Sequence, residues 1–293
     1  IEAVVWNNEE GSRFVPGTMG SGVYAGVYPL ESALRARDEA GVGMAEAVAA
    51  LRAALPEAAP RAPGAPMAAF VEAHIEQGPV LEAAGDTIGV VTGIQGARKF
   101  AVEVLGAEAH AGTTARAHRK DAFVAAVAIV NALHAAFHDA GDTVRFTVGQ
   151  FAVWPNARAV VPGRVRFAID FRHPDRAVLD ALGDRVAPIA AAHAGPCRAT
   201  VTELPRFDPV AFEGAVPDAI ARAARARGYR WRALPSGALH DAGHIAAIRP
   251  TGMVFVPCAQ GISHNEAESA DPADLTAGAQ VVADVLVDLA NRP

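Results

Sequence analysis

The sequence is poor in several features that mark whole classes of protein. Cysteine occurs only twice in 293 residues, at positions 197 and 258, and this wide separation argues against a disulfide framework and for a reducing compartment. We expect both thiols to be buried apolar residues. No apolar run approaches the ~20 residues of a membrane-spanning helix, and residues 1–6 are too short and wrongly flanked for a signal peptide. A cytoplasmic protein without a membrane partner is predicted.

Charge of one sign is not concentrated anywhere in the sequence. The 26 basic and 32 acidic residues give a formal charge of −6, and no basic run stands out, so nucleic acid and anionic membranes are not expected partners. The Gly-rich segment 89–96 does not form a phosphate-binding loop with a following lysine, and Ser236 lacks the flanks of a nucleophile elbow. A small-molecule substrate is the remaining expectation.

The hydrophobic pattern predicts an α/β protein with one domain inserted into another. The length, with 51% hydrophobic and 20% charged residues, is ordinary for a two-domain globular protein. Residues 1–6 are predicted to form a strand, and apolar residues at 44, 48, 51 and 55 are spaced as on a helix. The apolar segment 67–75 ends near His74, and ligands commonly lie at strand ends in α/β sheets.

Residues 99–204 show the β-α-β-β-α-β order of a ferredoxin-like α+β unit. Its strands are expected at 100–104, 144–148, 165–171 and 197–204, and its helices at 121–137 and 174–193. The predicted domain bounds are 96–206 for this inserted domain, and 1–95 with 207–293 for the outer one.

The outer domain resumes with a helix at 217–227, whose arginines are expected on a solvated face, and an apolar strand at 253–256. The last helix should begin at Asp271-Pro272, a capping residue followed by a first-turn proline. Its inward face is predicted to carry Leu275, Val282, Val285, Leu286 and Leu289.

Carboxylate and imidazole side chains occur at three turns far apart in the sequence. Glu9 and Glu10 follow the first predicted strand, where one could coordinate a metal and the other act as a general base; a solvated pair is the alternative. His74 precedes Glu76-Gln77-Gly78-Pro79, a polar turn typical of a pocket wall. His264 lies in a polar loop and could instead be merely exposed. Imidazole and carboxylate are ligands that zinc accepts in hydrolytic sites.

Four further residues, in three segments, are candidates for binding or supporting the substrate. His110 follows a strand of the inserted domain and could polarise a carbonyl or bind an oxyanion, or be a loop histidine. Arg172 ends an alternating strand and could bind a carboxylate bidentately, or pair with Asp170. His240 and Asp241 follow a turn and fit either a supporting hydrogen-bond pair or a substrate contact.

Taken in order, these segments resemble the M20-type metal-dependent amidohydrolases, in the branch of N-carbamoyl-L-amino-acid hydrolases, β-ureidopropionases and allantoate amidohydrolases. The resemblance covers essentially the whole chain and is carried by several specific motifs. They are Trp6 to Phe14, His74 to Pro79, Gly106 to Thr114 with Arg119 to Ala122, Pro155-Asn156 with Val161 to Gly163 and Asp170 to Arg172, Ser236 to Ala242, and Met253 to Glu268.

The resemblance implies a zinc-peptidase-like catalytic domain and a smaller lid domain that forms a homodimer. It implies two zinc ions per subunit, with manganese, cobalt or nickel as alternatives. Glu9 would be the general base, while His110 would reach the partner's active site. The implied metal ligands are Glu10, His74 and His264, and the implied substrate contacts are Gln77, His110, Arg172 and His240.

Departures from the family pattern modify these expectations. A histidine and a metal-bridging aspartate precede the Glu-Glu pair in the family, and the sequence begins eight residues before that pair. We therefore expect an incomplete catalytic domain, partial or absent zinc, and an inactive chain. Ala159 replaces an asparagine that would bind the substrate carboxylate, and Leu239 replaces a glycine before His240, so the pocket is expected to be reshaped.

The predicted reaction is hydrolysis of the carbamoyl C–N bond of N-carbamoyl amino acids, with release of ammonia and carbon dioxide. Allantoate hydrolysis and a non-catalytic dimeric relic of the fold are the alternatives. A dipeptidase is disfavoured, because the contexts Glu76 to Pro79 and Ala111 to Thr114 match the carbamoyl branch better.

Overall fold

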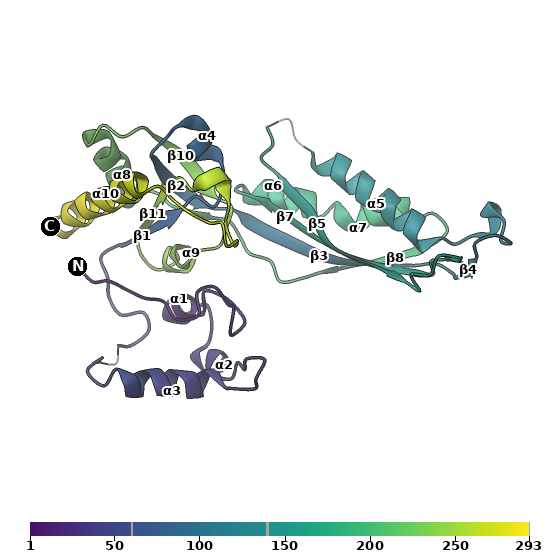
Figure 1. The fold of residues 1–293 in the computed structure, drawn as a ribbon, viewed down its shortest axis with the longest axis horizontal. Helices are drawn as coiled ribbons and strands as arrows, with labels where there is room; N and C mark the ends of the chain where they lie inside the picture. The colour runs from purple at the N-terminus through teal and green to yellow at the C-terminus, as the bar shows by residue number, and fades with distance from the viewer. Residues whose placement is uncertain (60, 139–140, 293) are drawn as a thin grey trace. The chain divides into compact units, whose positions relative to one another are not determined.

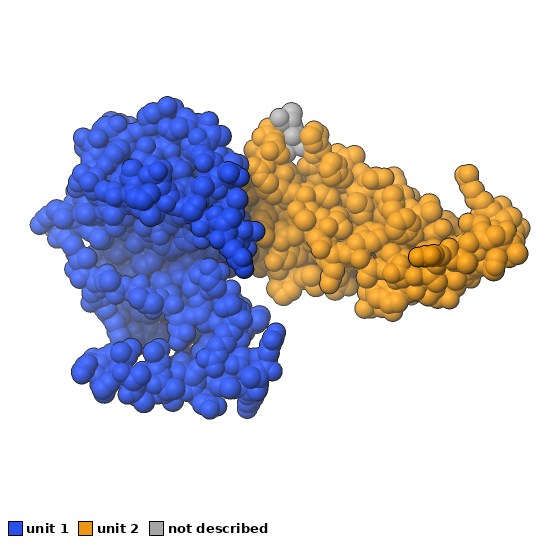
Figure 2. All heavy atoms as spheres, viewed as in Figure 1, with its two compact units in different colours: residues 1–94, 210–293 blue, residues 95–209 orange. Residues whose placement is uncertain are grey.

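The structure is a computed structural model that describes residues 1–59, 61–138 and 141–292. It divides into two compact units (Figure 2): unit 1 comprises residues 1–94 and 210–293, and unit 2 residues 95–209. Helices and strands occur in both units, so the predicted α/β class is confirmed. In the described part of the chain, no helix combines the length and the apolar character needed to cross a bilayer.

Unit 1 is built on a mixed sheet with the strand order β1-β11-β2-β10 (Figure 1). β1 runs parallel to β11, β2 runs antiparallel to β11, and β10 runs parallel to β2. The short β9 adds to the end of β2. The strands are β1 (Phe70–Ile75), β2 (Ile88–Ile94), β9 (Val210–Ala211), β10 (Trp231–Ser236) and β11 (Thr251–Val256).

One face of this sheet packs on two long helices, α8 (Ala215–Ala226) and α10 (Pro272–Ala290). Asp271 caps α10 by accepting a hydrogen bond from the Ala273 N–H, as predicted. The predicted inward position of Leu275 is wrong, because its side chain is 50% exposed. The buried residues of α10 are Ala277, Gly278, Val281 and Val285. Leu275 lies two residues before Ala277, about 200° around the helix, and therefore faces away from the sheet.

Three short helices precede the sheet: α1 (Met19–Tyr24), α2 (Leu30–Leu34) and α3 (Met44–Ala54). They surround a small core of Phe14, Met19, Ala33 and Met44. The helix predicted around residue 48 is confirmed, but Leu51 and Leu55 are exposed, because this core is too small to cover the second half of α3.

The strand predicted at residues 1–6 is wrong, since this segment pairs with no other strand among the described residues. A strand needs a neighbour for its backbone N–H and C=O groups. Without one, Ile1 and Val5 remain 82% and 96% exposed. The segment is held by ring contacts of Trp6 with Tyr24 and Phe70 and by an ion pair of Glu2 with Arg61.

Unit 2 is an antiparallel sheet in the order β5-β7-β3-β8, with three helices on one face. This is the predicted β-α-β-β-α-β succession. Its elements are β3 (Gly96–Leu105), α5 (Ala122–Phe137), β5 (Arg145–Trp154), β7 (Arg164–His173), α6 (Arg176–Gly183), α7 (Val186–His193) and β8 (Arg198–Glu203).

The single helix predicted at 174–193 is interrupted at Asp184 and Arg185. Pro188 explains the break, because it has no N–H to donate to the Asp184 carbonyl, and its ring would collide with that carbonyl in a continuous helix. The two helices still pack on the sheet, and Leu179 of α6 and Val186 of α7 are fully buried.

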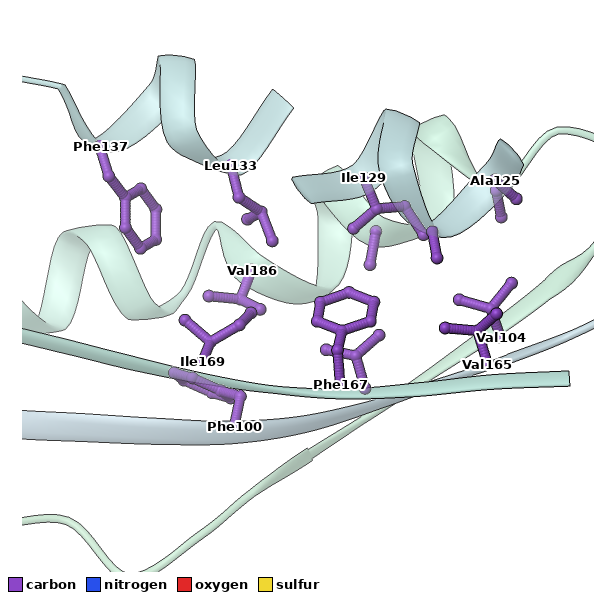
Figure 3. Packing of buried hydrophobic residues seen from close by; sticks show 14 of the residues in the cluster. Phe100, Val104, Ala125, Ile129, Leu133, Phe137, Val165, Phe167, Ile169 and Val186 are labelled. Carbon is purple, nitrogen blue, oxygen red and sulfur yellow. The ribbon is translucent and has the colours of Figure 1, made fainter. Parts of the chain in front are cut away.

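The core of unit 2 lies between α5, α7 and the sheet (Figure 3). Ile129 and Leu133 of α5 point toward Phe167 and Ile169 of β7. Burying side chains of this size contributes about 1.5–3 kcal/mol each. A separate two-stranded ribbon in this unit is formed by β4 (Ala109–His110) and β6 (Val160–Val161).

We predict that Ile129→Ala lowers the free energy of unfolding of unit 2 by about 2–5 kcal/mol, because it leaves a cavity in this core. Val124→Ala is the matched control on the same helix, since Val124 is exposed and its truncation should cost less than about 0.5 kcal/mol. Urea denaturation followed by tryptophan fluorescence measures both. Equal losses for the two variants would contradict the packing.

Candidate functional site

Strand β1 presents Glu72 and His74 on one face of the unit 1 sheet. Val71 and Ile75 alternate with them and pack into the helix-covered core on the other face. His74 lies opposite Phe255 of β11. Its Nδ1 is 2.9 Å from the Ile75 carbonyl oxygen, so the ring hydrogen lies on Nδ1 and the Nε2 lone pair is available to a ligand.

A buried polar layer lies beside His74. The His240 ring meets the His74 ring edge to face, with centroids 4.6 Å apart. Its Nε2 is 2.7 Å from Ser236 Oγ, and its Nδ1 is 3.7 Å from Glu72 Oε1. Glu72 Oε2 accepts a hydrogen bond from the N–H of Ala242, in α9 (Asp241–Ile245). The strand and this short helix therefore share one polar network.

Burial sets the protonation of this layer. The side chains of His240 and Glu72 are only 2% and 18% exposed. Burial, reinforced by nearby His74, lowers the pKa of His240 to about 3. Burial also raises the pKa of Glu72 to about 7; the Ala242 N–H opposes this rise, and Asp241 and Glu9 add to it. At neutral pH the imidazole of His240 is therefore uncharged.

The loop that carries Glu9 and Glu10 is closed by its own backbone and by Asn8. The Glu9 carbonyl accepts a hydrogen bond from the Thr18 N–H at 2.7 Å, and the Asn8 side-chain amide donates to the carbonyls of Phe14 and Pro16. Gly17 permits this closure, because a Cβ there would lie 2.9 Å from the Glu9 carbonyl oxygen.

Glu9 lies within the electrostatic reach of four other site residues. Burial raises the pKa of the Glu9 carboxyl, and the charges of Glu10 and Asp241 raise it further, while His74 and His264 lower it. Carboxylates and imidazoles from distant parts of the sequence therefore act electrostatically on one side chain. A carboxyl with a raised pKa is a better proton acceptor than an ordinary glutamate.

Glu10 and His264 form an exposed pair, with 3.6 Å between Oε2 and Nε2 and with both side chains about two-thirds exposed. The loop after η2 (Ala259–Gly261) is held by Glu268, which accepts hydrogen bonds from Ser263 Oγ and the His264 N–H. Gln77 Nε2 donates to Ser263 Oγ at 2.9 Å. The loops after β1 and β11 are therefore joined through Gln77.

Two buried contacts tie the Glu9 loop to α9. Ser21 Oγ donates to Asp241, and Thr18 Oγ1 is 2.9 Å from His244 Nε2. Sequence reasoning missed Thr18, Ser21 and His244, because no local pattern links residues more than 200 positions apart. Glu72 was also missed, although its position two residues before His74 on a strand signals a shared face.

The two remaining candidates, His110 and Arg172, belong to unit 2. His110 ends β4, and its Nδ1 accepts hydrogen bonds from the N–H groups of Gly112 and Thr113. Arg172 Nε donates to Asp170 Oδ1 at 3.1 Å, so the ion pair weighed as an alternative is present. In unit 1, His74 contacts His240, Glu10 lies beside His264, and Gln77 bonds to Ser263, next to His264.

The side chains of the unit 1 site are of the types that bind a divalent transition metal, but too few of them lie together to complete a site. Glu10 and His264 offer a carboxylate and an imidazole close together, and His74 offers another imidazole. A catalytic zinc needs three protein ligands. Across residues 1–59, 61–138 and 141–292, no three His, Cys, Asp or Glu side chains are grouped to hold a metal ion.

Comparisons with known proteins agree over the whole chain. The profile of peptidase family M20/M25/M40 matches residues 1–288. The chain is 40% identical to an N-carbamoyl-L-amino acid amidohydrolase of Geobacillus stearothermophilus over 287 residues, which cover 96% of this chain and 69% of the relative. It is 37% identical to an allantoate amidohydrolase of Bacillus subtilis over an alignment of 298 residues, which covers 99% of this chain and 71% of the relative.

Solved structures show the same fold. A hydantoinase/carbamoylase family amidase from Burkholderia multivorans superposes with a TM-score of 0.90 at 44% identity, covering 99% of this chain and 70% of that one. A second structure, a putative amidohydrolase/peptidase from Burkholderia cenocepacia, has a TM-score of 0.88 at 41% identity, and the match covers 99% of this chain and 70% of that one. The sequence-based recognition of the family is confirmed.

We predict that Glu72 makes unit 1 less stable as pH rises. The folded-state pKa lies above the ordinary value of 4.5, so the folded chain binds more protons than the unfolded chain between pH 4.5 and about 7. The contribution of Glu72 to the free energy of unfolding is fully present below pH 4.5 and is lost as the pH rises through about 7. This loss is on the order of 3 kcal/mol, and Glu72→Gln should remove it. Denaturation curves recorded at several pH values with chelator present measure the difference. An unchanged pH slope would refute the assignment.

Proposed function

This chain belongs to peptidase family M20/M25/M40, and we propose that it is an amidohydrolase that cleaves the carbamoyl C–N bond of N-carbamoyl amino acids. The observation that carries the proposal is the Glu10–His264 pair, 3.6 Å between Oε2 and Nε2, next in sequence to Glu9, whose pKa burial raises. The similarity to N-carbamoyl-L-amino-acid amidohydrolases over 96–97% of the chain supports the substrate class.

In the proposed reaction, Glu9 acts on water at the carbamoyl carbon. The carboxylate accepts a proton as the water oxygen forms its bond to carbon, and it returns this proton to the departing nitrogen. The raised pKa of Glu9 suits both steps, since the same group must take and release the proton. Loss of the first nitrogen leaves a carbamic acid, whose remaining C–N bond then breaks. One water is consumed, and the products are the free amino acid, carbon dioxide and ammonia.

The metal that we propose is zinc, with manganese, cobalt or nickel as alternatives. A bound divalent ion would polarise the carbonyl and lower the pKa of water. Glu10 and His264 are the proposed ligands of one ion, and His74 of the other. Because these donors are fewer than a catalytic site requires, the described residues account for only part of the centre.

Substrate binding is assigned to Gln77 and His240 in unit 1 and to His110 and Arg172 in unit 2. We propose that residues 96–206 form a lid that also makes a homodimer, and that residues 1–95 and 207–293 form the catalytic domain. Free thiols at Cys197 and Cys258 support a cytoplasmic location. Allantoate is the second candidate substrate, favoured by the 37% identity to the Bacillus subtilis enzyme.

We predict that Glu9→Gln in the complete gene product abolishes ammonia release from N-carbamoyl amino acids. The amide cannot accept the proton, and loss of a general base costs about 10²–10⁴-fold in rate, whereas metal content should be unchanged. Glu31→Gln is the matched control, because Glu31 is exposed on α2. Parallel assays with allantoate and dipeptides identify the substrate class. If neither N-carbamoyl amino acids nor allantoate released ammonia, the proposed function would be overturned and the non-catalytic relic favoured.

A second prediction concerns the metal. The 293-residue chain should bind zinc weakly and below two ions per subunit, since Glu10 and His264 supply only two grouped donors. Equilibrium dialysis with metal analysis measures the stoichiometry, and Glu10→Gln should lower it further. Tight binding of two zinc ions would show that further residues of the chain complete the centre.

A further inference from the structure

The turn after β4 holds the His110 imidazole by one of its two nitrogens. Nδ1 accepts hydrogen bonds from the Gly112 N–H at 3.1 Å and the Thr113 N–H at 3.2 Å. With two donors directed at it, Nδ1 carries the lone pair, and the ring hydrogen lies on Nε2. His110 therefore offers an exposed N–H donor whose direction is set by the turn.

Arg119 closes this turn. Its Nη2 donates to the Ala111 carbonyl at 2.6 Å, and its Nε donates to the Thr114 carbonyl at 2.9 Å. These two carbonyls flank the N–H groups that hold His110. The planar guanidinium suits such a bridge, because its donors are fixed relative to one another.

The bonding of Arg119 differs from that of several other arginines of unit 2. Arg98, Arg164, Arg166, Arg172 and Arg206 all pair with carboxylates. For Arg119, no carboxylate of a described residue lies within 4 Å. Both of its side-chain hydrogen bonds go to the one turn that carries His110.

The ends of this segment are fixed without Arg119. The Ala111 N–H donates to the Ala159 carbonyl, and the Ala107 N–H donates to the Lys120 carbonyl. Asp121 caps α5 by accepting from the N–H groups of Phe123 and Val124. Loss of the guanidinium should therefore loosen residues 111–114 and leave the sheet and α5 in place.

We propose that Arg119 is a positioning residue, which fixes the turn so that the His110 Nε2–H is directed at an oxygen of the substrate. An N–H donor held in this way suits a carbonyl oxygen that gains negative charge during hydrolysis. The effect of Arg119 on catalysis rests on the proposed function, whereas the claim that Arg119 fixes the turn does not.

Hydrogen exchange tests the turn directly and requires no activity. In Arg119→Ala, the Gly112 and Thr113 amides should exchange at least about tenfold faster, because two charge-assisted hydrogen bonds are lost. Amides of β3 and β7 should keep their protection. Guanidinium ion added well below denaturing concentration should restore protection to Arg119→Ala.

Arg185→Ala is the matched control, because Arg185 also donates to a backbone carbonyl, that of Ala136, in the same unit. It should leave the Gly112 and Thr113 amides unchanged. Unaltered exchange at these amides in Arg119→Ala, or equal loss of protection across the sheet, would overturn the positioning role.

A double-mutant cycle in the complete gene product tests the link to catalysis. Arg119→Ala and His110→Ala should each lower kcat by about 10- to 100-fold, and the double variant should be no slower than His110→Ala alone. Arg119→Lys should recover only part of the rate. Additive losses would show that Arg119 acts other than through His110. If the parent enzyme were inactive, the proposed function would fail, and the exchange result would still decide the structural claim.

Discussion

The candidate site depends on one buried polar layer between β1 and α9. The layer is buried or half-buried and fully hydrogen-bonded: Ser21 bonds to Asp241, Thr18 to His244, His240 to Ser236, and Glu72 to the Ala242 N–H. Buried polar groups cost several kcal/mol when they are left unpaired. This layer therefore fixes β1, α9 and the Glu9 loop as a set, and the exposed donors Glu10 and His264 are placed above it.

The same layer makes the site electrostatically crowded. Burial raises the pKa of Glu9, Glu72 and Asp241; the charges of Glu10 and Asp241 add to the rise at Glu9, and those of Asp241 and Glu9 to the rise at Glu72. Imidazoles at His74 and His264 offset part of this rise at Glu9. Such an arrangement is unfavourable for stability alone and is typical of sites that bind cations or transfer protons.

Periodicity predicted most of the fold, because alternation and helical spacing follow directly from which face is buried. It succeeded for the strand order of unit 2, where β3 and β7 alternate between a core-facing and an outer face. It failed where tertiary partners decide the outcome. Residues 1–6 are apolar yet pair with no described strand, Leu275 has an apolar side chain but faces solvent, and Pro188 divides a helix that the apolar pattern alone made continuous.

The site was only partly predictable for the same reason. Motifs identified Glu9, His74 and His264, since their turns are distinctive in sequence. The residues that support them, Thr18, Ser21 and His244, are ordinary in their local sequence, and their contacts span 220 positions or more. Their role arises from packing between α1 and α9 and becomes visible only in the folded chain.

Anomalous diffraction at the zinc edge, from crystals of the complete gene product grown with zinc, tests the central claim most directly. If Glu10, His74 and His264 hold the metal, density will be bonded to Glu10 and His264, with further density at His74 and the Glu9 carboxyl nearby. Zinc bound only to other residues, or Glu10, His74 and His264 directed to separate surfaces, would contradict it.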